Sequence, residues 1–223
     1  NTPRISRSYS FEKRVPSWQS TGLYAAPGET VTVTIPSEAA GKGMTVRIGA
    51  HTGTMWGHER WTRWPALSWT WPLDAAVSYA ANPFGGNIYI TTSEDIPLAS
   101  VNVVISNAIE SPWFVLDRTT SNQWRTLRKA PAPWAELGCR GIILTVPSES
   151  IRQLDDPTAL MRFWEQAVFL IDRVTGYAEN ERLRPERIVL DRMVAQGEMN
   201  PGYPMAALIA TGHEFITLPL LKD

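Results

Sequence analysis

The sequence predicts an α+β protein, in which an antiparallel β-sandwich of residues 1–115 is followed by an α/β layer of residues 116–223. Short segments of alternating apolar and polar residues, separated by Gly and Pro, recur through the first part and predict antiparallel strands. In the second part the patterns follow the order strand, helix, strand, strand, which is typical of an α/β layer. Hydrophobic residues make up 43% of the 223 residues and charged residues 19%, so the chain can form a core.

The strands of the first part are predicted from period-2 alternation and from the turns that bound them. Residues 30–35 (TVTVTI) and 44–49 (MTVRIG) alternate strictly. Residues 87–92 follow a turn that contains Gly85 and Gly86, and residues 101–105 form a fourth β-rich segment. We therefore expect these four segments to lie in the predicted sandwich.

The second part begins with signals for a short helix and a buried strand. Thr120 or Ser121 can cap a helix that runs to Lys129. The nearly continuous apolar run 141–147 predicts a buried strand, and Ser148 is a candidate start for a short helix.

A long helix and two further segments complete the second part. Asp156 and Pro157 predict its start, and Gly176 predicts its end. Its apolar residues follow helical spacing: Leu160, Phe163, Trp164, Ala167, Val168, Leu170, Ile171 and Val174. A strand is then predicted at 187–194, and a turn at 199–204 precedes the apolar stretch 205–210.

Tryptophan is unusually frequent, with ten residues in the chain. Five of them are clustered: Trp56, Trp61, Trp64, Trp69 and Trp71. Packing in the core is the usual use of such rings and is the favoured interpretation. The alternative is a platform on which sugars or peptides stack.

Charge and motif content exclude several classes of function. With 21 Lys and Arg against 22 Asp and Glu, the chain lacks the positive charge that nucleic-acid binding needs, and no apolar run is long enough to span a membrane. His58 and His213 are each followed by Glu, but Thr stands where the second His of HExxH is required. Cys139, the one cysteine, is expected to be a buried core residue. A pair of carboxylates stays open as a site, because 22 acidic residues are present and no spacing selects two of them. Judged by motif alone, the chain therefore carries no complete active site.

Nine short segments, in their order along the chain, carry a resemblance to a known family. They are 21–24 (TGLY), 48–52 (IGAHT), 63–65 (RWP), 82–90 (NPFGGNIYI), 132–137 (APWAEL), 143–148 (ILTVPS), 163–165 (FWE), 187–191 (RIVLD) and 202–205 (GYPM). From about Ser17 to Asp223 the chain resembles the enhancin-like zinc metallopeptidases, the M-sixty peptidase family.

This resemblance implies a zinc endopeptidase that cuts glycoproteins such as O-glycosylated mucins. It implies that residues 116–223 are the first half of a zincin-like catalytic domain. In the family the HExxH motif follows the Gly-Tyr-Pro segment, so the zinc ligands and the general base are expected beyond this chain. We expect zinc in the intact parent protein, none bound to this chain, and no activity of the chain alone. The resemblance also implies a secreted or cell-surface location.

The resemblance also assigns candidate site residues. Asn200, Gly202, Tyr203 and Pro204 are expected at the rim of the substrate cleft, although a rigid turn would explain them too. Asp191 is expected to support the site from behind its rim, or else to act as a local cap. The stretch after Tyr203 is predicted to be the edge strand nearest the zinc, where an extended peptide can pair.

The alternative function is a non-catalytic module that binds a glycan or a protein. In that case the tryptophan-rich sandwich would contact glycans, and the α/β part would be a remnant. A structural sandwich that only positions the peptidase is the third possibility.

Overall fold

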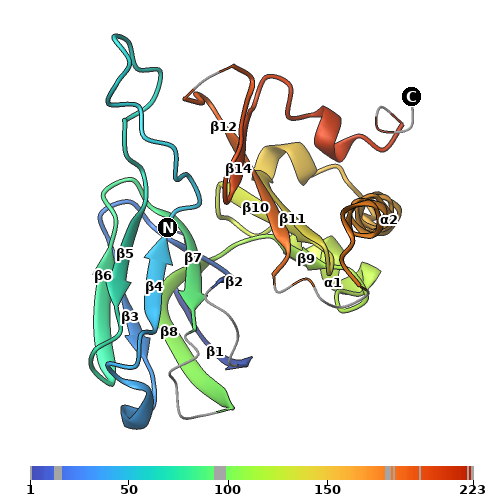
Figure 1. Cartoon of the computed structure of the whole chain (residues 1–223). Coiled ribbons are helices and arrows are strands. Elements are labelled where there is room, and N and C mark those ends of the chain that lie inside the picture. The colour runs from blue at the N-terminus through green and yellow to red at the C-terminus, as the bar shows by residue number, and fades with distance from the viewer. Residues whose placement is uncertain are drawn as a thin grey trace. The chain divides into compact units, whose positions relative to one another are not determined.

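The computed structural model describes residues 2–12, 17–92, 99–178, 182, 184–195, 197–219 and 221 (Figure 1). The chain divides into two compact units, Asn1–Ala50 with Leu67–Ser111 and His51–Ala66 with Pro112–Asp223. The segment 51–66 therefore belongs to the second unit, although the strands on either side of it belong to the first. The domain boundary between residues 115 and 116 stays a prediction.

The first unit is built on an antiparallel sheet. Its order is β5-β4-β7-β2-β8-β3-β6, and β1 also pairs with β8. The elements are β1 (Ile5–Glu12), β2 (Trp18–Ala25), β3 (Thr30–Thr34), the short 3-10 helix η1 (Ser37–Ala39), β4 (Thr45–Ile48), β5 (Trp69–Pro72), β6 (Val77–Ala81), β7 (Gly86–Thr91) and β8 (Ser100–Glu110).

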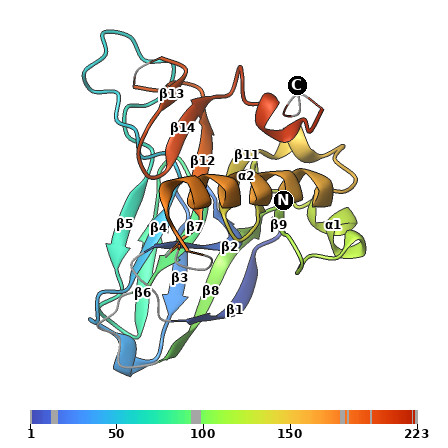
Figure 2. The same cartoon turned by 45° about the vertical axis from the view of Figure 1, so that its right-hand side comes forward.

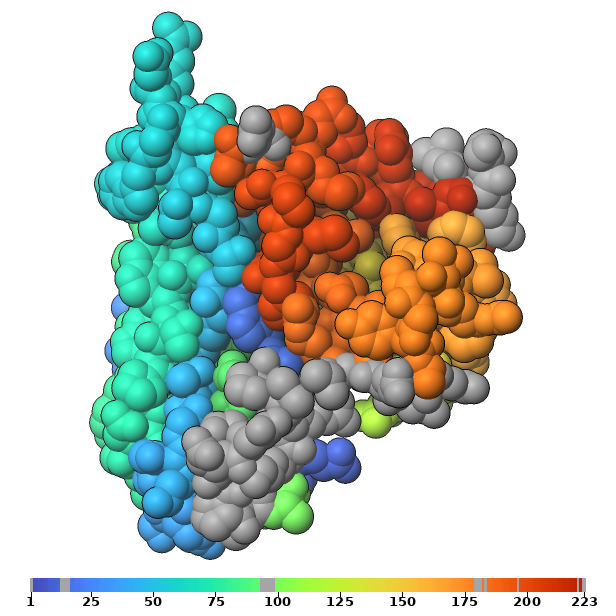
Figure 3. All heavy atoms as spheres, viewed as in Figure 1, coloured from blue at the N-terminus to red at the C-terminus, as the bar shows by residue number. Residues whose placement is uncertain are grey.

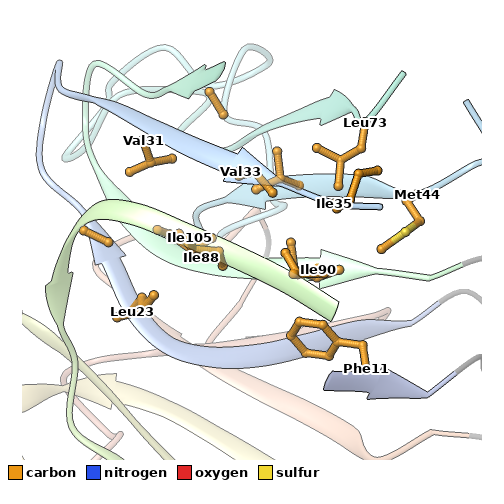
Figure 4. Close-up of a cluster of buried hydrophobic side chains, with 14 of the residues drawn as sticks. Phe11, Leu23, Val31, Val33, Ile35, Met44, Leu73, Ile88, Ile90 and Ile105 are labelled. Carbon is orange, nitrogen blue, oxygen red and sulfur yellow. The ribbon is translucent and has the colours of Figure 1, made fainter. Parts of the chain in front are cut away.

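Alternation places the apolar side chains of this sheet on one face, where they form the first core. Val31 and Val33 of β3 are fully buried while the threonines between and beside them are more exposed. In Figure 4 these side chains lie in one cluster with Ile105 of the adjacent strand β8 and with Ile88 and Ile90 of β7, which is not adjacent to β3 in the sheet. The predicted strands at 30–35, 44–49 and 87–92 are confirmed to within one residue at each end.

Strand β8 is longer than the predicted segment 101–105, because it pairs with three strands. It pairs with β1 and β3 over residues 100–108 and with β2 at Ile109 and Glu110. The mixed α+β class is confirmed, with sheets as the main component.

The second unit contains a mixed sheet of order β13-β14-β12-β11-β10-β9. The pairs β9/β10, β11/β12 and β12/β14 are parallel, and β10/β11 and β13/β14 are antiparallel. Its elements are β9 (Trp113–Val115), α1 (Ser121–Leu127), β10 (Trp134–Gly138), β11 (Ile142–Pro147), the 3-10 helix η2 (Ser148–Ile151), α2 (Thr158–Thr175), β12 (Glu186–Asp191), β13 (Met199–Asn200), β14 (Met205–Leu208) and the 3-10 helix η3 (Glu214–Ile216).

Both predicted helices are present, with ends shifted by one or two residues. Helix α1 ends at Leu127 and not at Lys129, and the N-cap of α2 is Pro157 and not Asp156. Thr120 forms a capping box with Gln123 at the start of α1. Asp156 Oδ1 accepts a 2.9 Å hydrogen bond from the backbone amide of Thr158, and Gly176 ends α2 in the left-handed conformation. Helix α2 covers one face of the six-stranded sheet (Figure 2).

The apolar stripe predicted for α2 is too wide. Leu160 and Val168 are buried, but Leu170, Ile171 and Val174 are exposed. At about 100° per residue, Leu170 and Val174 lie roughly 200° and 240° around the helix from Val168. They therefore point away from the sheet.

Two predictions at the end of the sheet are wrong. The strand predicted at 187–194 ends at Asp191, because the Asp191 carboxylate accepts a hydrogen bond from the Met193 amide and so turns the chain. The stretch after Tyr203 is not the edge strand, because β13 pairs outside β14 through Met199 and Asn200.

Candidate substrate-binding surface

The carboxyl ends of the parallel strands β11, β12 and β14 meet at one edge of the second sheet. Pro147, Asp191 and Leu208 are the last residues of these strands. In sheets with parallel strands this edge is the usual place for a ligand, because loops diverge there and leave a crevice.

The segment 51–66 is fixed to this edge by one arginine. Arg63 Nε donates to both carboxylate oxygens of Asp191, at 2.8 and 3.0 Å. The two side chains are only 5% and 3% exposed, so the ion pair is buried. The other guanidinium nitrogens of Arg63 donate to the carbonyl oxygens of Gly53, Trp64 and Pro65. Arg63 therefore holds both arms of the segment and joins them to β12.

His51 makes a second contact between the segment 51–66 and β12, beside the ion pair of Arg63 and Asp191. Its Nε2 lies 3.1 Å from the carbonyl oxygen of Leu190, the residue before Asp191. Its ring meets the ring of Trp134 edge-on, with 4.7 Å between the centroids. Inside the segment, Met55 is fully buried and its amide donates to the Pro65 carbonyl. The segment is thus a closed loop with an inner and an outer side.

Three tryptophans occupy the outer side of this loop. Trp56, Trp61 and Trp64 are 60%, 46% and 52% exposed. Trp61 is the central ring, edge-on to Trp56 at 5.5 Å and to Trp64 at 6.4 Å. The atoms of the segment 51–66 are cyan in the space-filling view (Figure 3). We call these three rings the tryptophan cluster.

The tryptophan cluster contradicts the favoured interpretation that these rings pack in a core. Met55 and Arg63 take the inward positions of the loop, so the rings are left outside. The remaining two tryptophans of the sequence cluster belong to β5 in the first unit, where Trp69 is exposed and Trp71 is half-buried.

The four residues predicted at the rim lie together in the connection between β13 and β14. Asn200 pairs with Ala206, and Gly202 has a φ of +132°, which favours glycine. The Tyr203–Pro204 peptide bond is cis. The Tyr203 ring lies under the Arg184 guanidinium, 3.5 Å from the ring centroid, and Pro204 is buried. Their role as substrate contacts stays a prediction.

Asp191 is buried and connects β12 to the tryptophan loop through Arg63. It also accepts the Met193 amide, as a local cap would. Its predicted support of a substrate site stays a prediction, and the structure supplies contacts for both interpretations.

A buried ion pair inside the sheet escaped the sequence analysis. Arg187 of β12 donates to Glu136 of β10, and the Thr145 hydroxyl of β11 donates to the same carboxylate at 3.0 Å. Charge patterning gave no signal for this pair, because its partners are 51 residues apart. His51 and Arg63 lie in two of the segments that carry the family resemblance, but no signal in the sequence indicated that either residue binds β12.

Cys139 is buried, as predicted. Burial raises the pKa of its thiol, so the group stays protonated and is a poor nucleophile.

The residues that the structure describes do not fit a zinc site. Within those ranges no group of three or more His, Cys, Asp or Glu side chains is placed to hold a metal ion. Among the described helices, none has the length and apolar character needed to cross a membrane.

Comparison with solved structures defines the class of fold. The M60 catalytic domain of ZmpC from Clostridium perfringens, solved in complex with the sialyl T antigen, superposes with a TM-score of 0.72 at 15% identity. The match covers 97% of this chain and 50% of that one. At this identity the likeness establishes the shared fold alone.

Sequence comparison defines the family. The profile of the N-terminal domain of M60-like peptidases matches residues 1–106, and that of Peptidase M60, enhancin and enhancin-like, matches residues 107–222. The chain therefore belongs to the enhancin-like M60 peptidase family.

Curated relatives carry a different kind of name. TRPM8 channel-associated factor 3 of Rattus norvegicus is 34% identical over 86% of this chain and 21% of its own length. TRPM8 channel-associated factor 1 of Homo sapiens is 32% identical over 92% of this chain and 22% of its own length. The chain thus spans about a fifth of the length of these relatives.

Proposed function

We propose that this chain is the substrate-recognition part of a zinc metalloendopeptidase that acts on glycoproteins such as O-glycosylated mucins. In this proposal the first unit is a β-sandwich and the second is the first half of a zincin-like catalytic domain. The protein works outside the cell, secreted or at the cell surface. Membership of the M60 family supports the reaction class.

The tryptophan cluster is the observation that carries the proposal. Aromatic faces that remain exposed on a fixed loop are costly to leave in water and mark a binding surface. The apolar C–H faces of a sugar pack well on such rings, while its hydroxyls stay hydrated. The buried pair of Arg63 and Asp191 holds the loop in place before the ligand arrives, which lowers the entropic cost of binding.

The proposal assigns cleavage to the longer parent protein. The family resemblance places the zinc ligands and the general base after the turn that contains Gly202, Tyr203 and Pro204. We therefore expect the 223-residue chain to bind a glycoprotein without cutting it, and the zinc to act in the parent protein.

Substitution in the tryptophan cluster tests the proposal. Trp61→Ala removes the central ring, and binding of the chain to an O-glycosylated mucin is measured by calorimetry. We expect affinity to fall roughly tenfold or more, as for a central aromatic contact of an interface. Trp69→Ala is the matched control, because Trp69 is an exposed tryptophan in the other unit.

Two results would contradict the proposal. One is a wild-type chain that does not bind the mucin. The other is a Trp61→Ala variant that binds as tightly as the Trp69→Ala variant.

A protein-binding module without catalysis is the second candidate. The names of the curated relatives, channel-associated factors, favour it. Enzymatic removal of the O-glycans discriminates the two candidates. Glycan recognition predicts that binding is lost with the glycans, whereas a module that reads the polypeptide keeps its affinity.

A further inference from the structure

A pocket of about 420 Å³ opens at the carboxyl ends of β11, β12 and β14. Its lining comes from Pro147 at the end of β11, Arg192 directly after β12 and Ile209 directly after β14. Trp134 closes another side, because β10 starts where antiparallel β11 ends. The volume is in the range of small-molecule sites, roughly 300–1,000 Å³.

The apolar wall of the pocket is rigid. Trp134 lines the pocket together with its chain neighbour Pro133 and its cross-strand partner Pro147. Ser148 fixes the neighbouring backbone, since its amide donates to the Pro133 carbonyl and its hydroxyl to the Ala132 carbonyl at 2.7 Å. The edge-on contact with the His51 ring, at 4.7 Å between centroids, holds the Trp134 ring. A tryptophan held in this way offers a preformed surface for one face of a sugar.

The polar wall carries an excess of positive charge. Arg152 and Arg192 line the pocket with a single carboxylate, that of the exposed Glu149. Arg152 Nη1 donates to the Arg128 carbonyl at 2.5 Å, which orients its guanidinium. Within the described part of the chain, the exposed Arg192 guanidinium has no ion pair and no hydrogen bond. Its planar fork is therefore available to a carboxylate or a sulfate.

We propose that this pocket binds the acidic group of a glycan, with the sugar ring against Trp134 and the anion against Arg152 and Arg192. The anion is the carboxylate of a sialic acid or the sulfate ester of a hexose, since both present two coplanar oxygens to a guanidinium. This inference rests on the proposed glycoprotein-binding function and narrows it to acidic glycans. The pocket is separate from the tryptophan cluster. In this proposal the rings of the cluster contact neutral and acidic sugars alike, and the pocket selects the acidic ones.

Small sugars of defined charge test the pocket directly. The probes are the methyl glycoside of N-acetylneuraminic acid, a sulfated methyl galactoside and neutral methyl galactoside, titrated into the 223-residue chain by calorimetry. The wild-type chain is expected to bind at least one acidic probe roughly tenfold more tightly than the neutral one, as for a charge-assisted contact.

Variants of Arg192 distinguish a direct contact between its guanidinium and the anion from general attraction of anions to a positive surface. Arg192→Gln is expected to remove the preference for the acidic probe, and Arg192→Lys to retain part of it because the charge remains without the fork. Arg192 is exposed, so both variants should fold. Arg118→Gln is the matched control, because Arg118 is an exposed arginine of the same unit that does not line the pocket.

Each outcome decides the inference. A preference for the sialoside alone or for the sulfated sugar alone supports it and identifies the source of the anion. Equal binding of acidic and neutral probes, no binding of any probe, or equal effects of Arg192→Gln and Arg118→Gln would overturn it. The proposed function is judged separately, by the loss of mucin binding on Trp61→Ala.

Discussion

The buried pair of Arg63 and Asp191 should be the main anchor of the tryptophan loop, and Asp191→Asn tests this. The substitution keeps the size of the side chain and removes its charge. It leaves the 5%-exposed Arg63 guanidinium without an ionic partner. Removing one partner of a buried pair typically costs 3–5 kcal/mol.

The contacts of Arg63 indicate that Asp191→Asn lowers the free energy of unfolding by an amount at the lower end of that range. The hydrogen bonds from Arg63 to the carbonyls of Gly53, Trp64 and Pro65 lie inside the loop and do not depend on Asp191. The loop can therefore leave β12 as a unit, which limits the loss. We expect the free energy of unfolding to fall by about 3 kcal/mol, roughly a hundredfold in the equilibrium constant.

Two measurements check this expectation. Urea unfolding gives the change in free energy, and hydrogen exchange of the peptide 51–66 reports whether the loop opens. Asp155→Asn is the control, because Asp155 pairs with Arg128 but is 88% exposed, so its loss should stay below about 1 kcal/mol. If Asp191→Asn costs no more than Asp155→Asn, or if exchange of the loop is unchanged, the anchoring role is wrong.

Two further predictions concern the scaffold. Gly86→Ala should destabilise the first unit by about 3 kcal/mol in urea unfolding, because a Cβ at its φ of +150° would lie 2.6 Å from the Gly49 backbone. Gly28→Ala, also at positive φ but facing open space, should cost only about 1 kcal/mol, and equal losses would refute the steric argument. Cys139 should resist alkylation in the folded chain, since burial raises the pKa of its thiol, and should react once urea unfolds the chain. The same shift predicts that stability falls as the pH rises above the pKa of an unfolded cysteine, and rapid alkylation of the native chain would contradict it.

Local patterns predicted those parts of the fold that local physics controls. The alternation of Val31 and Val33 with threonines defines a strand with one buried face, and the structure has that strand. The hydroxyl of Thr120 and the flexibility of Gly176 act within one helical turn, so their capping roles were visible in the sequence.

Long-range pairing explains what the sequence could not reveal. Arg63 and Asp191 are 128 residues apart, and no periodic pattern relates them. A tryptophan-rich segment without strand alternation is compatible with two structures. The rings are buried if they face a core, and they stay exposed if another side chain takes the inward position. Arg63 takes that position here, and its partner is encoded in a different part of the chain.

The carboxyl end of β12 is where these observations meet. The Leu190 carbonyl binds His51, the Asp191 carboxylate binds Arg63, and Arg192 lines the pocket. Three consecutive residues therefore connect the tryptophan loop and the pocket to the same strand end. A rigid strand holds such groups at fixed spacing far better than a mobile loop does. The support of a substrate site by Asp191 stays a prediction, and the structure gives it a physical form: the Asp191 carboxylate holds Arg63 of the loop, while its neighbour Arg192 lines the pocket.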